Sequence, residues 1–192
     1  MKTEHCSNCR VSELSEEAPV IPNIKKGSKV LFLLDYPTIE DCDTGRVATG
    51  LSKRYAVLHN LMEDTGFDPV IVSYATTIRC ITRSKSTLTY PDYEYCSKLI
   101  LKDLERSEIR AVLCFGSMAA RVLTGRGIER IDKLRGEIYD TCIDGITCAV
   151  TYALSILTED SCLGCGKNVY PHLVRKDMKM FKADLHKKRI IE

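Results

Sequence analysis

The sequence predicts an α/β fold, a three-layer αβα sandwich with a mostly parallel central sheet. Two observations carry this prediction. Continuous apolar runs of strand length, typical of strands that are buried on both faces, recur along the chain. Segments with apolar residues at helical spacing separate these runs, and such alternation is typical of parallel strands joined by helices. We expect one domain over residues 1–192.

The clearest strand is KVLFLLD, which has five apolar residues in a row between Lys29 and Asp35. The last two strands meet at Asp144 and Gly145, a pair typical of hairpins. Gly66 marks the end of the first helical segment. The expected strands are residues 29–35, 70–75, 109–115, 137–142 and 146–152. The expected helices are residues 51–65, 91–105, a short one from 117 to near 125, and 171–188. The segments expected outside these elements are a polar leader, 1–28, and a loop, 36–50.

The composition is typical of a soluble globular domain, with 44% hydrophobic and 28% charged residues and a net charge of +2. The sequence has no apolar run of membrane-spanning length, and its start, MKTEHCSNCR, lacks the apolar core of a signal peptide. We therefore expect no membrane partner and a location in the reducing cytoplasm of a prokaryote or a phage-infected host cell. With so small a net charge, a nucleic-acid surface would require local clusters of basic residues.

Ten cysteines call for an explanation in a compartment where thiols stay reduced. Cys6 and Cys9 form a pair in the polar leader, and Cys80 and Cys96 follow with fifteen residues between them. Four thiolates suit a [4Fe–4S] cluster or zinc. Redox catalysis is disfavoured, because a thioredoxin-type pair follows a strand and opens a helix. Four unrelated core thiols are the remaining alternative.

A second pair, Cys162 and Cys165, lies in the segment SCLGCGKN. Together with other cysteines or His172 it predicts a second metal site, for zinc. Two alternatives stay open. The segment is either a thiol-bearing loop without metal or an exchange partner of Cys6 and Cys9 as cluster ligands.

The spacing of Cys6, Cys9, Cys80 and Cys96 resembles that of the family 4, iron–sulfur type of uracil-DNA glycosylases. The similarity covers nearly the whole chain. FLLDYPT lies where the family has a strand ending in G-E-A-P-G, and GRVATG matches the loop G-R-P-F-V-G. ATTIRC and TYALS fall on A-N-V-L-K-C and T-Y-H-P-S, and CFGSMAARVLTG matches a strand–turn–helix. The resemblance implies a glycosylase-like fold and a [4Fe–4S] cluster that braces the leader and the loop between its last two ligands.

The residues that carry the chemistry of the family differ here. Ala48 replaces the aromatic that stacks on uracil, which removes about 1–3 kcal/mol of stacking. Thr76 replaces an asparagine that reads the base, and Ala153 replaces a histidine that stabilises the leaving group. Asp35 stands at the position of an acidic residue. Because ligands bind at the carboxyl ends of parallel strands, we expect Asp35 and Thr76 to be the polar groups left for catalysis, with a loop hydrogen bond as the alternative role of Asp35.

The predicted DNA contacts lie in three places. Residues 79–90 resemble the cluster-supported loop that contacts phosphates in the family, although a solvated polar loop is the alternative. A helix N-terminus after Gly116 attracts phosphate, and the segment LRGE offers a guanidinium. The basic C-terminal helix, 171–192, is a further nucleic-acid face or a solvated one. The predicted contacts are Arg79, Arg83, Lys85, Ser117 and Arg135.

Three hypotheses for function follow. The first is an iron–sulfur protein of the glycosylase superfamily that has lost uracil excision. It would bind single- or double-stranded DNA as an accessory of replication or repair, together with a protein of that machinery. The second is a glycosylase for a different or modified base. The third is a protein-interaction subunit of a nucleic-acid machine.

Overall fold

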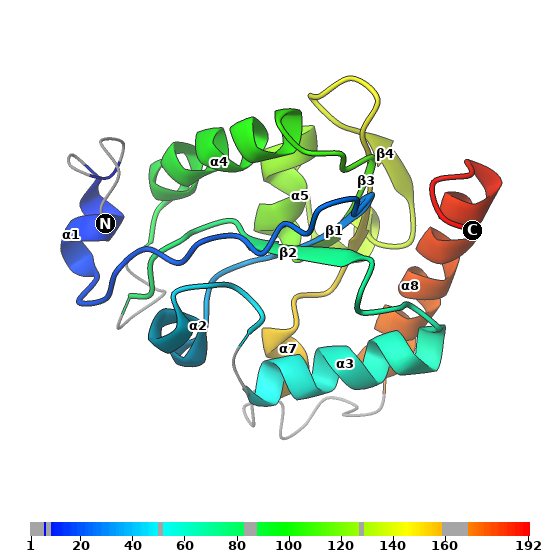
Figure 1. Ribbon diagram of the computed structural model, residues 1–192, viewed down its shortest axis with the longest axis horizontal. Helices are drawn as coiled ribbons and strands as arrows, with labels where there is room; N and C mark the ends of the chain where they lie inside the picture. Colours follow the sequence, from blue (N-terminus) through cyan, green and yellow to red (C-terminus); the bar gives the residue numbers. More distant parts are fainter. Residues whose placement is uncertain (1–5, 7–8, 50–51, 83–87, 127–128, 159–168) are drawn as a thin grey trace.

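The computed structural model describes residues 6, 9–49, 52–82, 88–126, 129–158 and 169–192. Its centre is a five-stranded sheet in the order β2-β1-β3-β5-β4 (Figure 1). The four parallel strands and the antiparallel edge strand confirm the predicted α/β class and the predicted hairpin. The strands are β1 (Val30–Leu34), β2 (Val72–Thr76), β3 (Ala111–Phe115), β4 (Ile138–Asp140) and β5 (Thr147–Thr151).

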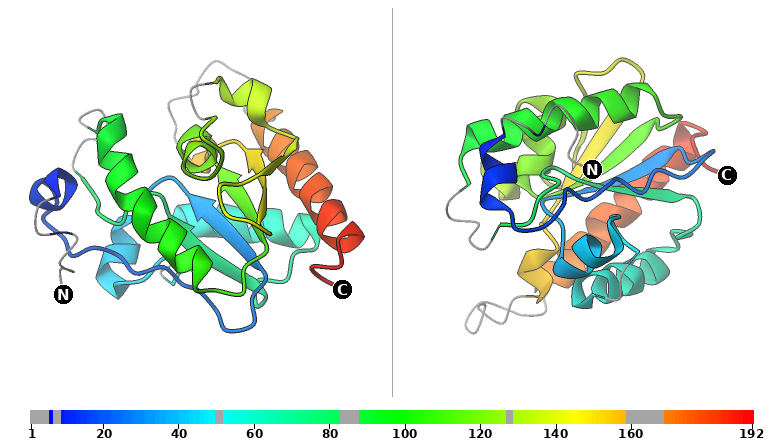
Figure 2. Two further views of the ribbon diagram at one scale, coloured as in Figure 1. Left: turned by 90° about the horizontal axis from the view of Figure 1, so that it is seen from above. Right: turned by 60° about the vertical axis from the view of Figure 1, so that its left-hand side comes forward.

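Helices cover both faces of the sheet, as Figures 1 and 2 show. On one face α3 and α8 pack against alternate strand residues such as Phe32 and Phe115. On the other face α4 and α5 pack against residues such as Leu31 and Val112. Every residue of β1, β2 and β3 is buried, which explains the continuous apolar runs in the sequence. The helices are α1 (Arg10–Leu14), α2 (Ile39–Thr44), α3 (Lys53–Thr65), α4 (Tyr90–Glu105), α5 (Ser117–Thr124), α6 (Ile131–Leu134), α7 (Ser155–Thr158) and α8 (Val169–Lys187).

The structure departs from the predicted elements at short segments. The expected loop 36–50 contains α2, which a capping box between Thr38 and Asp41 begins and Gly45 ends. Strand β2 begins two residues later than expected, because Asp68 accepts the N–H of Val70 and holds a turn there. These signals are local hydrogen bonds, which apolar periodicity does not reveal.

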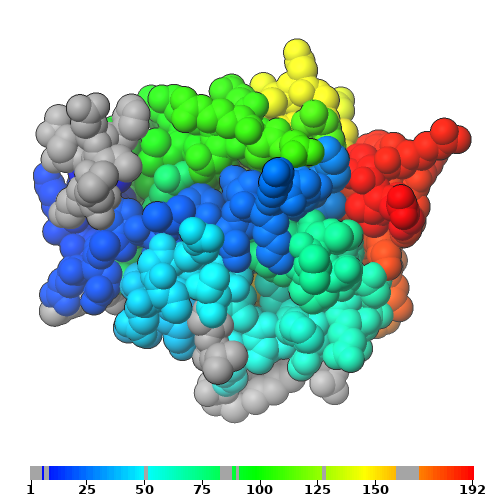
Figure 3. Space-filling view, viewed as in Figure 1, coloured from blue at the N-terminus to red at the C-terminus, as the bar shows by residue number. Residues whose placement is uncertain are grey.

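The leader runs along the outer edge of β2. Asn23 and Tyr74 exchange backbone hydrogen bonds of 2.8 and 3.0 Å, and the N–H of Val20 donates to Arg79 O at 2.7 Å. Figure 3 shows this segment, in blue, on the surface of the molecule. Helix α1, which precedes this segment in the chain, lies at the start of α4, where Arg10 pairs with Asp92 at 2.7 Å. In the described part of the chain, no helix combines the length and apolar character needed to cross a bilayer.

Candidate functional site

A small pocket lies at the carboxyl edge of the parallel strands, where α/β sheets bind their ligands. Segments that are far apart in the sequence form it: the ends of β1 and β3, the first turn of α3 and the residues after β5. Its lining includes Asp35, Tyr36, Arg54, Phe115 and Ser155. Of the two predicted catalytic residues, the structure brings Asp35 to this pocket.

The Asp35 carboxylate lies against Gly116, the residue that precedes α5. A Cβ atom on Gly116 would lie 2.5 Å from Asp35 Oδ1, and the φ angle of Gly116 is +104°. The space and the backbone conformation both require glycine here. The carboxylate is thereby held beside the N-terminus of α5, where the helix dipole attracts negative charge.

Thr76, the second predicted catalytic residue, is the last residue of β2 and is 1% exposed. Its hydroxyl has no hydrogen-bond partner among the described residues. It does not line the Asp35 pocket. The next residue, Thr77, connects the two strand ends, because its N–H donates to Leu34 O at 2.8 Å and its hydroxyl donates to Asp35 O. The two predicted residues thus end neighbouring strands without sharing one cavity.

Arg54, which is not among the predicted site residues, closes the pocket. Its Nη1 donates to Tyr36 O at 2.7 Å, and its guanidinium lies 4.4 Å from the centre of the Tyr36 ring. The enclosed space is about 10 Å³, which is about enough for one water molecule. A nucleobase therefore does not fit in this conformation. The sequence gives one signal for Arg54, a basic residue in the first turn of a helix that begins beside the sheet edge.

Asp41 has a structural role in the segment between β1 and α3. It is fully buried, and its carboxylate accepts from the backbone N–H groups of Thr38 and Ala48, both at 2.8 Å, and from the Tyr55 hydroxyl at 2.8 Å. Burial, reinforced by this carboxylate, raises the pKa of Tyr55. Asp41 thereby holds Ala48 at a φ angle of +59°, which is uncommon for a residue other than glycine.

The four cysteines predicted as ligands, Cys6, Cys9, Cys80 and Cys96, are all buried thiols. Cys9 and Cys80 belong to one apolar cluster with Val11 and Ile78. Burial raises the pKa of Cys96, a backbone hydrogen bond from Arg79 lowers it, and repulsion from Cys9 and Cys6 raises it further. Cys96 is therefore close enough to both cysteines of the leader for their charges to affect it. The four residues, from three distant segments, therefore share one region of the molecule.

The arrangement of these thiols is not that of a compact ion site. Within the described ranges, no group of three or more histidine, cysteine, aspartate or glutamate side chains is placed to hold a metal ion. A structural zinc site needs its four ligands at the corners of one small tetrahedron. The four cysteines are thus neighbours without being gathered around a single point.

Tyr93 of α4 connects this region to the pocket. It packs against the apolar cluster that contains Cys9 and Cys80. Burial, followed by the negative charge of Asp35, raises the pKa of its hydroxyl to about 12. The cysteine region and the Asp35 pocket are therefore adjacent, on either side of one tyrosine.

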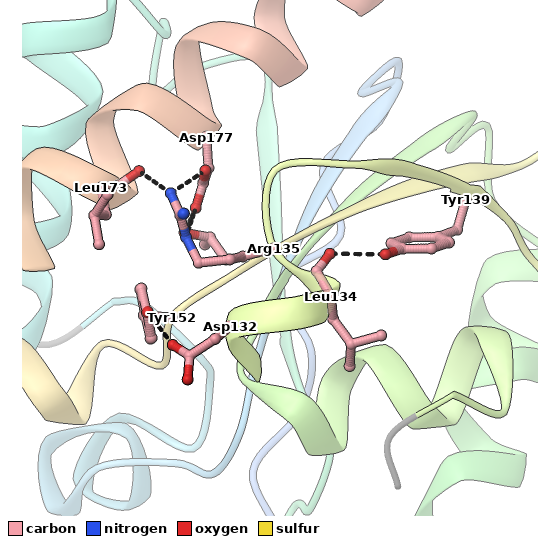
Figure 4. A network of polar contacts seen from close by, with 8 residues as sticks. Asp132, Leu134, Arg135, Tyr139, Tyr152, Leu173 and Asp177 are labelled. Carbon is pink, nitrogen blue, oxygen red and sulfur yellow. Dashed lines mark hydrogen bonds and ion pairs between the residues drawn. The ribbon is translucent and has the colours of Figure 1, made fainter. Parts of the chain in front are cut away.

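Two of the predicted DNA contacts are engaged within the protein. Arg79 is 15% exposed and pairs with Asp103 of α4. Arg135 donates to the two carboxylate oxygens of Asp177 at 3.0 and 2.6 Å, as Figure 4 shows, and Thr151 donates to the same carboxylate at 2.8 Å. A phosphate would have to displace these carboxylates. Arg135 instead holds the segment before β4 against α8.

Of the other predicted DNA contacts, the structure describes Ser117 but not Arg83 and Lys85. Ser117 is half-buried at the start of α5, next to the residue that approaches Asp35. Arg83 and Lys85 lie outside the described residues, as do Cys162 and Cys165 of the proposed second metal site. Ala153, at the position of the family's histidine, is half-buried just before α7.

Comparison with known proteins adds no relative. A scan against models of protein families finds no match, and neither does a search of curated proteins.

Proposed function

We propose that the chain is an iron–sulfur DNA-binding protein of the uracil-DNA glycosylase superfamily. In this proposal it has lost uracil excision and serves as an accessory of replication or repair. One observation carries the proposal. The four cysteines named from the sequence are buried together, while the pocket that would hold a base has room for about one water molecule.

The [4Fe–4S] cluster is the group that the spacing of the four cysteines implies. A cluster distributes its thiolates over four iron atoms, so that its ligands lie further apart than those of one zinc ion. The four buried thiols, from three segments of the chain, are the ligands that such a group needs. The cluster, when bound, would supply a structural bridge between the leader, the end of β2 and α4.

The sheet edge supports the loss of excision. The expected glycosylase-like fold puts Asp35, Thr76 and Ala153 at the carboxyl ends of three strands. Here Thr76 is the last residue of β2, and Asp35 and Ala153 follow β1 and β5. The side chains at the positions of the stacking aromatic and the histidine are methyl groups. Arg54 and Tyr36 fill the space beside Asp35. These positions at the strand ends fit the proposal, and the space beside Asp35 is too small for a flipped base.

DNA binding is assigned to the segment between Cys80 and Cys96. Its sequence, ITRSKSTLTYPDYEY, combines basic and hydroxyl side chains, which are the groups that contact phosphates. Both ends of the segment are fixed by buried cysteines. A cluster on those cysteines would fix the two ends of the segment that contains Arg83 and Lys85.

The cluster is tested on anaerobically purified protein. We expect about four iron atoms and four sulfides per chain, no stoichiometric zinc, and a brown protein. Cys80→Ser should lose the iron and the colour. Cys148→Ser is the matched control, because Cys148 is equally buried but lies in β5, and it should keep both. Wild-type protein without iron and sulfide would refute the cluster.

DNA binding is tested by gel shift with single- and double-stranded oligonucleotides over a range of salt. The double variant Arg83→Ala/Lys85→Ala should bind more weakly and lower the slope of log K against log salt by roughly 2, because two phosphate contacts are lost. The control variant Lys26→Ala/Arg106→Ala removes the same charge. Both residues are exposed and lie near the amino ends of the strands, so the slope should stay unchanged. No binding to either DNA at low salt would remove this part of the proposal.

A second function is favoured by one observation, the buried hydroxyl of Thr76 that has no partner in the described residues. Such a group, together with Asp35, suits an enzyme for a different or modified base. Release of any free base from a panel of modified oligonucleotides, abolished in Asp35→Ala, would support this alternative.

A further inference from the structure

A second, larger cavity lies away from the Asp35 pocket, at the outer edge of β2. It is open to solvent on one side, and the leader, the turn before β2, the segment after α2 and one face of α3 line it; its volume is about 190 Å³. Its walls are mostly apolar, from Ala48, Leu58, Met62 and Pro69. A cavity of this kind, with few polar groups in it, is the general form of a small-molecule site.

The polar groups of the cavity are cationic or neutral. Lys25 lies on its rim, where Nζ donates to Pro69 O and lies 5.4 Å from the centre of the Tyr74 ring. The Tyr74 hydroxyl donates to Met62 Sδ at 3.4 Å, so it is engaged within the wall. The Tyr55 hydroxyl is likewise engaged, by Asp41. The ammonium of Lys25 thus keeps N–H groups for a ligand, beside apolar and aromatic surface.

The charge of Lys25 is only partly compensated. Burial lowers the pKa of its ammonium, and the carboxylate of Asp68 raises it in part. Between these two residues the structure has no ion pair within 4 Å in the ranges described. A ligand that brings a negative group to Nζ would offset the desolvation of the ammonium.

The cavity also depends on strained backbone. Ala48 lines it at a φ angle of +59°, held there by the buried carboxylate of Asp41. A non-glycine residue in this conformation is unfavourable by about 1–2 kcal/mol, and such strain persists where the surroundings enforce it, often at ligand sites. The methyl group of Ala48 leaves the cavity open, where a larger side chain would fill it.

We propose that this cavity is a binding site for a small organic anion, a carboxylate on a planar apolar body, with Lys25 as the group that pairs with the carboxylate. The aromatic ring of Tyr74 and the side chains of Leu58 and Met62 contact the apolar body. The site is separate from the Asp35 pocket and does not depend on a cluster or on DNA binding.

The test uses benzoate as the probe and benzamide, its neutral isostere, as the control, in ¹H–¹⁵N NMR titrations of the full chain. Benzoate should give saturable shifts at Lys25, Ala48, Tyr74 and His59, and benzamide should bind at least about tenfold more weakly, the loss of one charge-assisted contact. Equal binding of the two, or shifts confined to other residues, would overturn the proposal.

Variants identify the cation. Lys25→Met keeps the apolar stem and should weaken benzoate binding about tenfold, while Lys25→Arg should keep most of it. Lys26→Met is the matched control, one residue away and exposed, and should bind as the wild type does. If Lys25→Met, shown by its thermal melt to be folded, binds benzoate like the wild type, Lys25 is not the group that pairs with the anion.

Discussion

The cysteine region and the Asp35 pocket lie on either side of Tyr93, yet they are held together in different ways. In the cysteine region, Cys9 and Cys80 pack in one apolar cluster, and the ion pair between Arg10 and Asp92 joins α1 to α4. In the pocket, a guanidinium stacks on a ring and donates to a backbone carbonyl, and little space remains. The first region contains buried thiols that can act as ligands, whereas the second has room for about one water molecule. The first is therefore suited to a bound group, and the second resists one.

Removing the proposed cluster should separate the two regions most clearly. After exposure to air and a chelator, we expect the backbone amides of residues 9–14 to exchange with solvent roughly 100-fold faster, because the bridge between leader and α4 is lost. Amides of β1 and β3 should change little. Hydrogen exchange followed by mass spectrometry measures both. Equal protection of the leader with and without iron would show that the apolar contacts suffice.

Gly116→Ala should damage the pocket through packing alone. The added Cβ meets the Asp35 carboxylate, and φ is unfavourable, so we expect the free energy of unfolding to fall by roughly 3 kcal/mol or more. Gly125→Ala is the control, since it has a similar positive φ without any atom within 4 Å, and should lose only about 1–2 kcal/mol. The double variant Asp35→Gly/Gly116→Ala should recover part of the loss in urea denaturation. No recovery would mean that Asp35 is not the source of the conflict.

Arg135→Met tests whether Arg135 is a structural residue or a DNA contact. It leaves Asp177 buried without its cation, so we expect a loss of about 3 kcal/mol in urea denaturation and an unchanged salt dependence of DNA binding. Lys29→Met, which breaks the exposed pair with Glu108, should leave stability almost unchanged, because solvent screens such a pair. A lower salt slope with intact stability would restore Arg135 as a phosphate contact.

Arg54→Ala should destabilise the protein less than Gly116→Ala or Arg135→Met does, and its main effect should be on the pocket. It removes one hydrogen bond and a contact with the Tyr36 ring, together about 1–2 kcal/mol. The opened pocket should then accept small planar ligands such as uracil, observed as new NMR shifts at Phe115 and Ser155. If neither the wild type nor the variant binds uracil, Arg54 alone does not close the site.

The strands could be predicted because each one is a short run of consecutive apolar residues. Five consecutive apolar residues in β1 suit only a strand that is buried on both faces. Helix α2 was not predictable by periodicity, since six residues with a capping box contain too few turns. The engagement of Arg135 could not be seen either, because its partner Asp177 lies 42 residues away. For the candidate site, Asp35 followed from its place after a strand, whereas Arg54 depends on how α3 meets the sheet.

The pairing of the leader with β2 has a consequence for the behaviour of the chain in solution. The backbone of Asn23 forms hydrogen bonds with Tyr74, whose N–H and C=O groups would otherwise be unpaired at the edge of the sheet. An unpaired edge strand can pair with a strand of another molecule, which is how many sheet proteins aggregate. A variant that begins after Gly27 should therefore self-associate more readily. The N-terminal segment thus also protects the sheet against aggregation.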